Sequence, residues 1–154
     1  MLNRDIINRE VINELLVHLF NEILDIEQVF MKDRGIKDLS VIEVHLLGLI
    51  SSIPTPTMSS IAKKATLTNG TVTTAIKKLE EKNCVERIKD KHDKRIIRVM
   101  VTSKGANACR VHQAFHDEMI GSICEDTDSL QDEHLIESLR KLCYFFEEIR
   151  DKLK

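Results

Sequence analysis

Hydrophobic residues recur at helical spacing over most of this chain. Between residues 5 and 31 they repeat every three or four positions, which predicts one long helix with the apolar face Ile7, Val11, Leu15, Leu19, Ile23, Ile26 and Phe30. A second set widens this face and consists of Ile12, Leu16, Phe20 and Leu24. An apolar face this wide exceeds what one small domain can cover, so the helix is expected to pack against a further partner.

Three shorter helices are expected next, and each starts at a residue suited to cap it. Ser40 with Glu43 three residues later is the pattern of a capping box, and the helix it starts must end before Pro54. Thr57 is the expected cap of a helix over 58–65, and Thr68 the cap of a helix over 69–82. This last helix would turn inward Val72, Ala75, Ile76 and Leu79, and outward Asn69, Gly70, Thr71, Thr73, Thr74, Lys77 and Lys78.

The apolar pattern changes to strict alternation after residue 84, which predicts two strands paired as a hairpin and ending near Val101. The connecting residues 89–95 are charged and lack the Asn-Gly of a tight turn, so they should form a protruding loop. Helical spacing returns over residues 103–124 and 129–152. The expected fold is therefore mainly α with a small β-hairpin.

Composition removes several classes of protein. The 154 residues fit one domain, and no apolar run approaches the roughly 20 residues of a membrane span. The N-terminal residues lack the apolar core of a signal peptide. The four cysteines lie far apart (Cys84, Cys109, Cys124 and Cys143), which indicates reduced thiols and a cytoplasmic location. Phosphate-binding loops, metalloprotease motifs and serine-nucleophile motifs do not occur.

Charge is distributed unevenly along the chain. The formal net charge is −2, which by itself argues against a nucleic-acid partner. Residues 58–105, however, contain 12 Lys and Arg against 5 Asp and Glu, a balance of +7, and the remainder carries −9. The low overall charge therefore hides one basic section.

This basic section has the element order of a winged helix-turn-helix: a short helix, a turn, a second helix and a charged hairpin. The outward face of the second helix supplies small polar groups that suit base edges, and the loop supplies cations for phosphates. The predicted DNA-binding residues are Asn69, Gly70, Thr71, Thr73, Thr74 and Lys77 on the helix and Lys91, Lys94 and Arg95 on the loop. The alternative is a solvated charged face without a ligand.

The same residues resemble the MarR family of transcription factors. The resemblance lies in the run from Leu67 to Thr74 and on through Glu80, in Asp93-x-Arg95, and in Val101-Thr102-x-x-Gly105. It implies an obligate-type homodimer that binds a pseudo-palindromic operator in double-stranded DNA. Residues 1–36 and 103–154 would form the dimerisation region and residues 37–102 the winged helix-turn-helix. Arg95 would reach a minor groove, held in place by Asp93.

Short segments along most of the chain also resemble FabT-type repressors of fatty-acid synthesis. Among them are 26–29, 37–40, 70–74 and 115–121. The resemblance implies long-chain acyl-acyl carrier protein as corepressor, with the acyl chain in an apolar cavity. Suitable wall residues are Phe30, Met31, Leu46, Leu47, Phe115 and Met119, each of which is otherwise an ordinary core residue.

Zinc is an alternative signal. His112 and His116 stand four residues apart on one helical face, and His45 lies on a helix expected to pack nearby. Glu43 or Asp117 could add a carboxylate. This arrangement is similar to that of zinc-sensing members of the MarR family, whereas histidines on a helix otherwise serve in packing or hydrogen bonding.

Three further alternatives have less support. Thiol sensing through the first helix has no basis, because no cysteine precedes Cys84. An enzyme could use a His pair with Glu118, but no nucleophile accompanies them. A protein-interaction module would show no salt-dependent affinity for DNA, whereas a DNA-binding protein should lose affinity steeply as salt rises.

Overall fold

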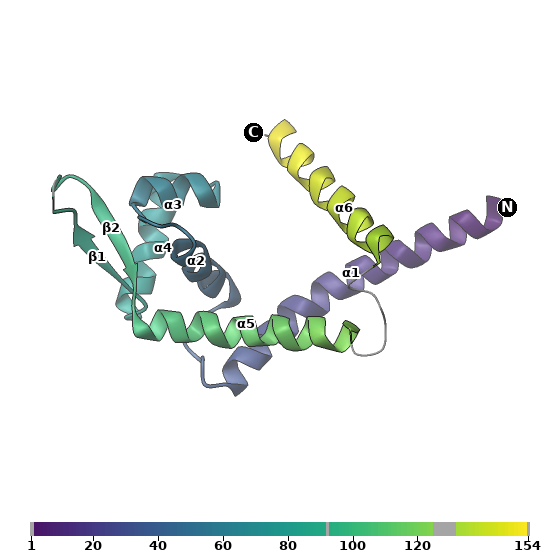
Figure 1. Ribbon diagram of the computed structural model, residues 1–154, viewed down its shortest axis with the longest axis horizontal. Coiled ribbons are helices and arrows are strands. Elements are labelled where there is room, and N and C mark those ends of the chain that lie inside the picture. Colours follow the sequence, from purple (N-terminus) through teal and green to yellow (C-terminus); the bar gives the residue numbers. More distant parts are fainter. Residues whose placement is uncertain (1, 92, 125–131, 154) are drawn as a thin grey trace. The chain divides into compact units, whose positions relative to one another are not determined.

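The computed structural model describes residues 2–91, 93–124 and 132–153, which form six helices and two strands. In chain order these are α1 (Leu2–Asp33), α2 (Val41–Ser51), α3 (Met58–Ala65), α4 (Asn69–Glu81), β1 (Val85–Lys89), β2 (Ile97–Val101), α5 (Ser103–Cys124) and α6 (Glu133–Lys152) (Figure 1). The predicted order of helices and hairpin is confirmed. The chain divides into two compact units, residues 1–115 and residues 116–154.

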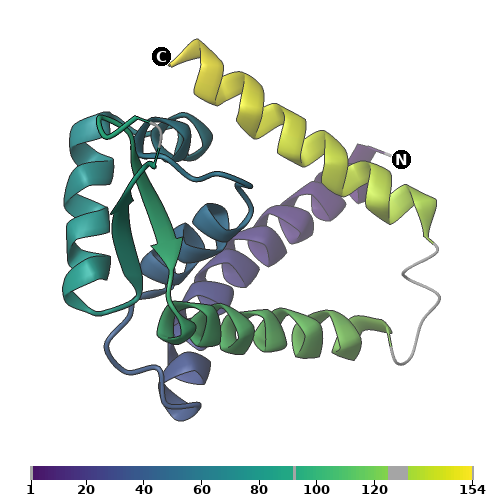
Figure 2. The ribbon, with the colours of Figure 1, turned by 60° about the vertical axis from the view of Figure 1, so that its left-hand side comes forward.

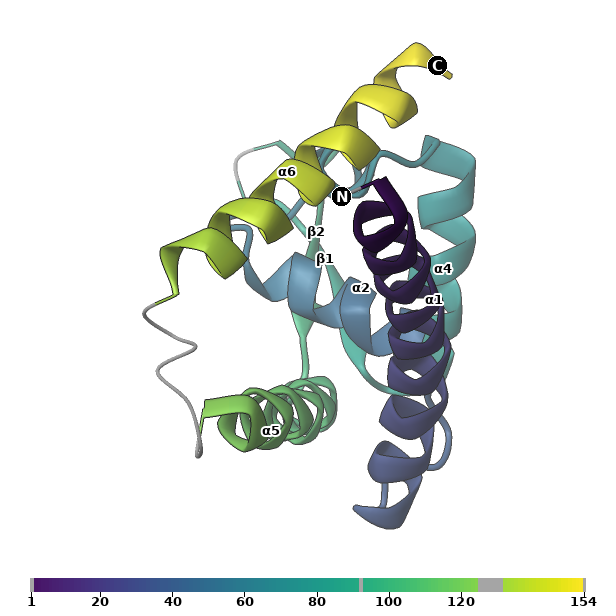
Figure 3. The same cartoon turned by 90° about the vertical axis from the view of Figure 1, so that its right-hand side faces the viewer.

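Helix α1 is one continuous helix that ends just before Gly35, whose positive φ of 90° only glycine adopts readily (Figure 3). Its last turns join the core: Met31 is fully buried, and the Gln28 side chain donates to the Leu39 carbonyl and accepts from the Val41 N–H. The apolar residues nearer its N-terminus are exposed, among them Ile7, Val11, Ile12, Leu15, Leu19, Phe20 and Leu24. The first part of α1 therefore presents an apolar face that nothing in its own unit covers.

The predicted caps of three helices are confirmed. Ser40 and Glu43 form a reciprocal capping box at the start of α2, and Thr57 forms another with Ser60 at the start of α3. Thr68 caps α4 by accepting the Thr71 N–H. These local bonds place each helix start within one residue of the position that the sequence predicts.

Helices α2, α3 and α4 pack together with the hairpin, and α4 runs beside it (Figure 2). The buried residues at the centre include Val44, Leu47, Ile50, Ile61, Val72, Ile76, Leu79, Val85 and Val99. The strands pair antiparallel with Val85 opposite Val101, and the Val99 N–H of β2 also donates to the Pro56 carbonyl. Gly105 allows α5 to begin against this core, since a Cβ there would lie 2.4 Å from the Cys84 carbonyl oxygen.

Helix α6 belongs to the second unit and begins at Glu133, where the Asp132 carboxylate accepts the N–H groups of His134 and Leu135. The predicted start near residue 129 is therefore wrong, and residues 125–131 lie outside the described part. The large apolar residues of α6 are exposed, among them Leu139, Tyr144, Phe145 and Phe146. In the described residues, no helix is long and apolar enough to span a bilayer.

Candidate nucleic-acid interface

Helices α3 and α4 are joined by a tight turn. Thr66 adopts the left-handed conformation at φ 56° and ψ 41°, and the Leu67 N–H then donates to the Ala62 carbonyl. Two residues later the Thr68 cap starts α4. A short helix, a turn of this kind and a second helix together make a helix-turn-helix, in which the second helix is the one that enters a DNA groove.

The orientation of α4 is fixed by its buried side, because Val72, Ile76 and Leu79 are fully buried. All six predicted DNA-binding residues of this helix are exposed on the rest of its surface (Asn69, Gly70, Thr71, Thr73, Thr74 and Lys77). The Thr73 hydroxyl donates to the Asn69 carbonyl at 2.8 Å, and the Thr74 hydroxyl donates to the Gly70 carbonyl at 3.1 Å. The exposed face of α4 therefore carries small side chains and two lysines, Lys77 and Lys78, with no acid before Glu80.

The loop between the strands is ordered by Asp90, which the sequence analysis missed. Asp90 is 7% exposed, forms an ion pair with Arg98 across the hairpin and accepts the Asp93 N–H at 3.1 Å. Asp93 in turn accepts the Arg95 N–H at 2.9 Å, so it holds the Arg95 backbone. The only sign of this role in the sequence was the position of Asp90, an acid between two lysines. Around this turn Lys91, Lys94 and Arg95 are exposed, and His92 lies outside the described residues.

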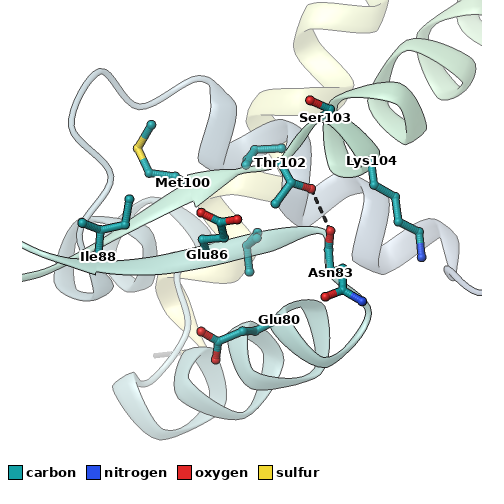
Figure 4. A pocket seen from close by; sticks show the side chains of 10 residues that line it. Glu80, Asn83, Glu86, Ile88, Met100, Thr102, Ser103 and Lys104 are labelled. Carbon is teal, nitrogen blue, oxygen red and sulfur yellow. Dashed lines mark hydrogen bonds between the residues drawn. The ribbon is translucent and has the colours of Figure 1, made fainter.

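A surface groove of about 660 Å³ runs along the hairpin near the end of α4 (Figure 4). Glu80 and Glu86 line it together with exposed Ile88 and Met100. The Arg87 guanidinium hydrogen-bonds Glu80, which lowers the pKa of that carboxyl and raises the pKa of Arg87. Lys104 also lines the groove, so its walls carry charges of both signs.

Two ion pairs connect the ends of the helices in the first unit. Lys82 at the end of α4 donates to both oxygens of Glu43 at 2.7 and 2.8 Å, and Lys104 on α5 pairs with Asp38. Burial raises the pKa of Glu43, but hydrogen bonds from Lys82 and Ser40 outweigh it and the pKa lies below its usual value. The hydrogen bond from Lys104 lowers the pKa of Asp38. Both carboxylates therefore stay ionised and hold α4 and α5 to the start of α2.

A cluster of two histidines and one carboxylate lies between α1, α2 and α5. The Nε2 atoms of His45 and His112 are 3.0 Å apart, and Glu27 Oε1 lies 3.2 Å from His112 Nε2 and 3.9 Å from His45 Nε2. His116 follows His112 by one turn of α5. The predicted partnership with Glu43 is wrong, because Glu43 is engaged by Lys82 and Ser40. Glu27, buried on α1, is the carboxylate that the sequence analysis missed.

The proposed effector residues of the first unit divide into two groups. Met31 and Leu47 are fully buried members of the core, and Leu46 packs against it. The rings of Phe30 and Phe115 meet edge to face with centroids 5.5 Å apart. Met119 belongs to the second unit and is half-buried.

The thiols of the first unit are suited to packing. Cys84 is fully buried and Cys109 half-buried, and burial raises the pKa of both. A raised pKa keeps each thiol protonated and weakly nucleophilic. The structure gives neither of them an environment for redox sensing.

Fold and site together define a winged helix-turn-helix DNA-binding protein. A model of the MarR family matches residues 39–97, which span α2 to the first residue of β2. The HTH-type transcriptional regulator SarZ of Staphylococcus haemolyticus is 30% identical over 105 residues, 67% of this chain and 69% of SarZ. The chain belongs to the MarR family of DNA-binding transcriptional regulators.

Solved structures agree with this assignment. Streptococcus pneumoniae FabT in complex with DNA superimposes with a TM-score of 0.82 at 33% identity, covering 92% of this chain and 99% of FabT. The S. aureus MepR–DNA complex gives a TM-score of 0.68 at 20% identity, covering 86% and 96%, and so shares the fold. Dimerisation is typical of the family, which consists of transcription regulators.

Proposed function

We propose that this chain is a cytoplasmic repressor of fatty-acid biosynthesis genes that uses long-chain acyl-acyl carrier protein as corepressor. The observation that carries the proposal is the likeness to FabT over nearly the whole chain, at 33% identity. The segments at 26–29, 37–40, 70–74 and 115–121, which resemble FabT-type repressors, are part of the same likeness.

The repressor would act as a homodimer through α1, α5 and α6. The exposed apolar residues on α1 and α6 support this, because such large unpartnered faces are unusual on a monomer. The dimerisation region would comprise residues 1–36 and 103–154, and residues 37–102 would bind DNA. Two copies related by a twofold axis would present two α4 helices to half-sites roughly 10 base pairs apart in a pseudo-palindromic operator.

Each copy would place α4 in a major groove and the loop around Arg95 in the adjacent minor groove. The exposed residues of α4 and the cations Lys91, Lys94 and Arg95 support this arrangement. The acyl chain would lie beside the Phe30–Phe115 ring pair, where α1 and α5 meet.

Acylated carrier protein is expected to tighten the binding of DNA from fatty-acid-synthesis promoters. The affinity of the protein for a fluorescent promoter duplex would be measured with palmitoyl-carrier, with unacylated carrier and without carrier. A coupling of 1–3 kcal/mol, roughly 5- to 150-fold, is typical of such effectors. Unacylated carrier serves as the control, and equal affinities in all three arms would refute the corepressor role.

A zinc-responsive repressor is the second candidate, and the cluster of Glu27, His45 and His112 favours it. Ligand atoms on a tetrahedral zinc ion lie roughly 3.3 Å apart, since each is about 2.0–2.1 Å from the metal. The three separations of 3.0, 3.2 and 3.9 Å fit this geometry. The sequence predicts His116, one turn beyond His112 along α5, as a further ligand. Without a metal, the 3.0 Å separation is a hydrogen bond between the imidazoles of His45 and His112.

Zinc is therefore expected to bind the dialysed protein with one ion per chain if this candidate holds. Calorimetric titration with zinc chloride would measure the stoichiometry, and His112→Asn should weaken binding at least 10-fold by removing one ligand. His134→Asn, which removes an exposed histidine of α6, is the matched control. Absence of zinc binding, or equal affinity of both variants, would contradict the candidate.

A further inference from the structure

Three threonine hydroxyls on the exposed face of α4 are already engaged within the helix. Thr73 donates its hydroxyl proton to the Asn69 carbonyl at 2.8 Å, and Thr74 donates its own to the Gly70 carbonyl at 3.1 Å. The Thr71 hydroxyl lies 2.8 Å from the Thr68 hydroxyl. Carbonyl oxygens only accept, so the direction of the first two bonds is fixed.

These bonds limit what Thr73 and Thr74 can offer to DNA. A hydroxyl has one proton and two lone pairs, so a hydroxyl that has donated can still accept but cannot donate again. Both residues are exposed. Each therefore presents an apolar methyl group and a hydrogen-bond acceptor to any base edge that approaches α4.

In the major groove this combination fits an A·T pair and opposes guanine. Adenine presents the N6 amino donor and its thymine partner presents the C5-methyl group, so one pair supplies both complements. Guanine presents only the acceptors N7 and O6. A hydroxyl that already donates its proton to a helix carbonyl cannot donate to them. Cytosine offers an amino donor but no methyl group.

We infer that Thr73 and Thr74 are specificity-determining residues that select A·T pairs in each half-site, through thymine methyl contacts and acceptance from adenine N6. The inference rests on the proposed placement of α4 in the major groove. It is independent of the genes controlled and of the effector, because it concerns only the chemistry of the α4 surface.

Selection from a random pool of 30-base-pair duplexes tests it without a known operator. The duplexes selected by the wild-type protein are expected to contain two half-sites. Positions at which Thr73→Ser or Thr74→Ser weakens the base preference should be A·T in the wild-type selection. Thr73→Val keeps the methyl group and should retain thymine. Ser138→Ala removes a similarly back-bonded hydroxyl from the exposed face of α6 and should leave the selected sequence unchanged.

Deoxyuridine then isolates the methyl contact on the selected duplex. Replacing one thymine in each half-site should weaken wild-type binding about fourfold per methyl, so roughly 15-fold over two half-sites. The Thr73→Ser or Thr74→Ser variant matched to that position should lose less than twofold on the same replacement. Non-additive effects of the base change and the residue change indicate that the two groups are in direct contact.

Guanine or cytosine at the affected positions, or equal deoxyuridine effects on wild type and serine variants, would overturn the inference while leaving DNA binding intact. Failure of the wild-type protein to enrich any sequence would refute sequence-specific DNA binding and this inference together. Failure of the acyl-carrier experiment would refute only the proposed effector, since the pool contains neither promoter nor carrier.

Discussion

Replacing Arg98 with methionine is expected to disorder the loop that connects β1 and β2, the wing of the fold, and to weaken DNA binding. The substitution removes the Arg98 guanidinium from the Asp90 carboxylate, which is 7% exposed. Removing one member of a fully buried pair costs about 3–5 kcal/mol. Because the Arg98 side chain is 39% exposed and its charge is partly screened by solvent, we expect roughly 2 kcal/mol of unfolding free energy.

Urea unfolding at fixed protein concentration measures this loss, and anisotropy with a duplex selected from a random pool measures binding. Arg110→Met is the matched control, because Arg110 is an exposed arginine on α5 that donates to Asn107. We expect the control to change neither quantity by more than about 0.5 kcal/mol. If the Arg98→Met variant is as stable as the wild type and binds DNA with the same affinity, the Asp90–Arg98 pair does not organise the loop.

Replacing Arg95 with alanine is expected to weaken DNA binding without affecting the fold. Arg95 is exposed, and its backbone N–H rather than its side chain is held by Asp93. Loss of a specific groove contact costs roughly 1–3 kcal/mol, and a dimer would lose two such contacts. The combined loss would exceed roughly 2 kcal/mol in affinity, or about 30-fold.

The comparison with Lys94→Ala separates groove recognition from simple charge. A lysine that contacts phosphate should weaken all duplexes alike and reduce the salt dependence by about one unit of slope, whereas Arg95 should matter most on the selected duplex. Unfolding midpoints of both variants should equal that of the wild type. Equal affinity of Arg95→Ala and wild type would contradict the role of the wing in DNA binding.

Features that depend on neighbouring residues could be predicted from the sequence. The caps at Ser40, Thr57 and Thr68 are local, because each cap bonds an N–H three residues away. The exposed face of α4 followed from the spacing of Val72, Ile76 and Leu79, which are buried as predicted. The start of α6 was misplaced because apolar periodicity says little about helix ends, and Asp132 fixes that end.

Features that depend on packing between distant segments could not be predicted in the same way. Glu27 meets His112 across 85 residues of sequence, so only the arrangement of α1 and α5 reveals it. Asp90 and Arg98 lie close in sequence, but their pairing depends on the hairpin register, which the charged loop does not specify. Asp93 accepts a hydrogen bond from the Arg95 backbone N–H, a bond that the sequence pattern alone does not specify.

Salt dependence of DNA binding tests most directly whether the basic section from 58 to 105, with its balance of +7, binds duplex DNA as the proposed dimer. Affinity for the selected duplex would be measured by anisotropy between 50 and 200 mM salt. Six to ten phosphate contacts predict a loss of about 10³- to 10⁵-fold over this range, with two chains bound per duplex. Binding that is absent, or that salt leaves unchanged, would contradict the assignment of α4 and the wing to DNA.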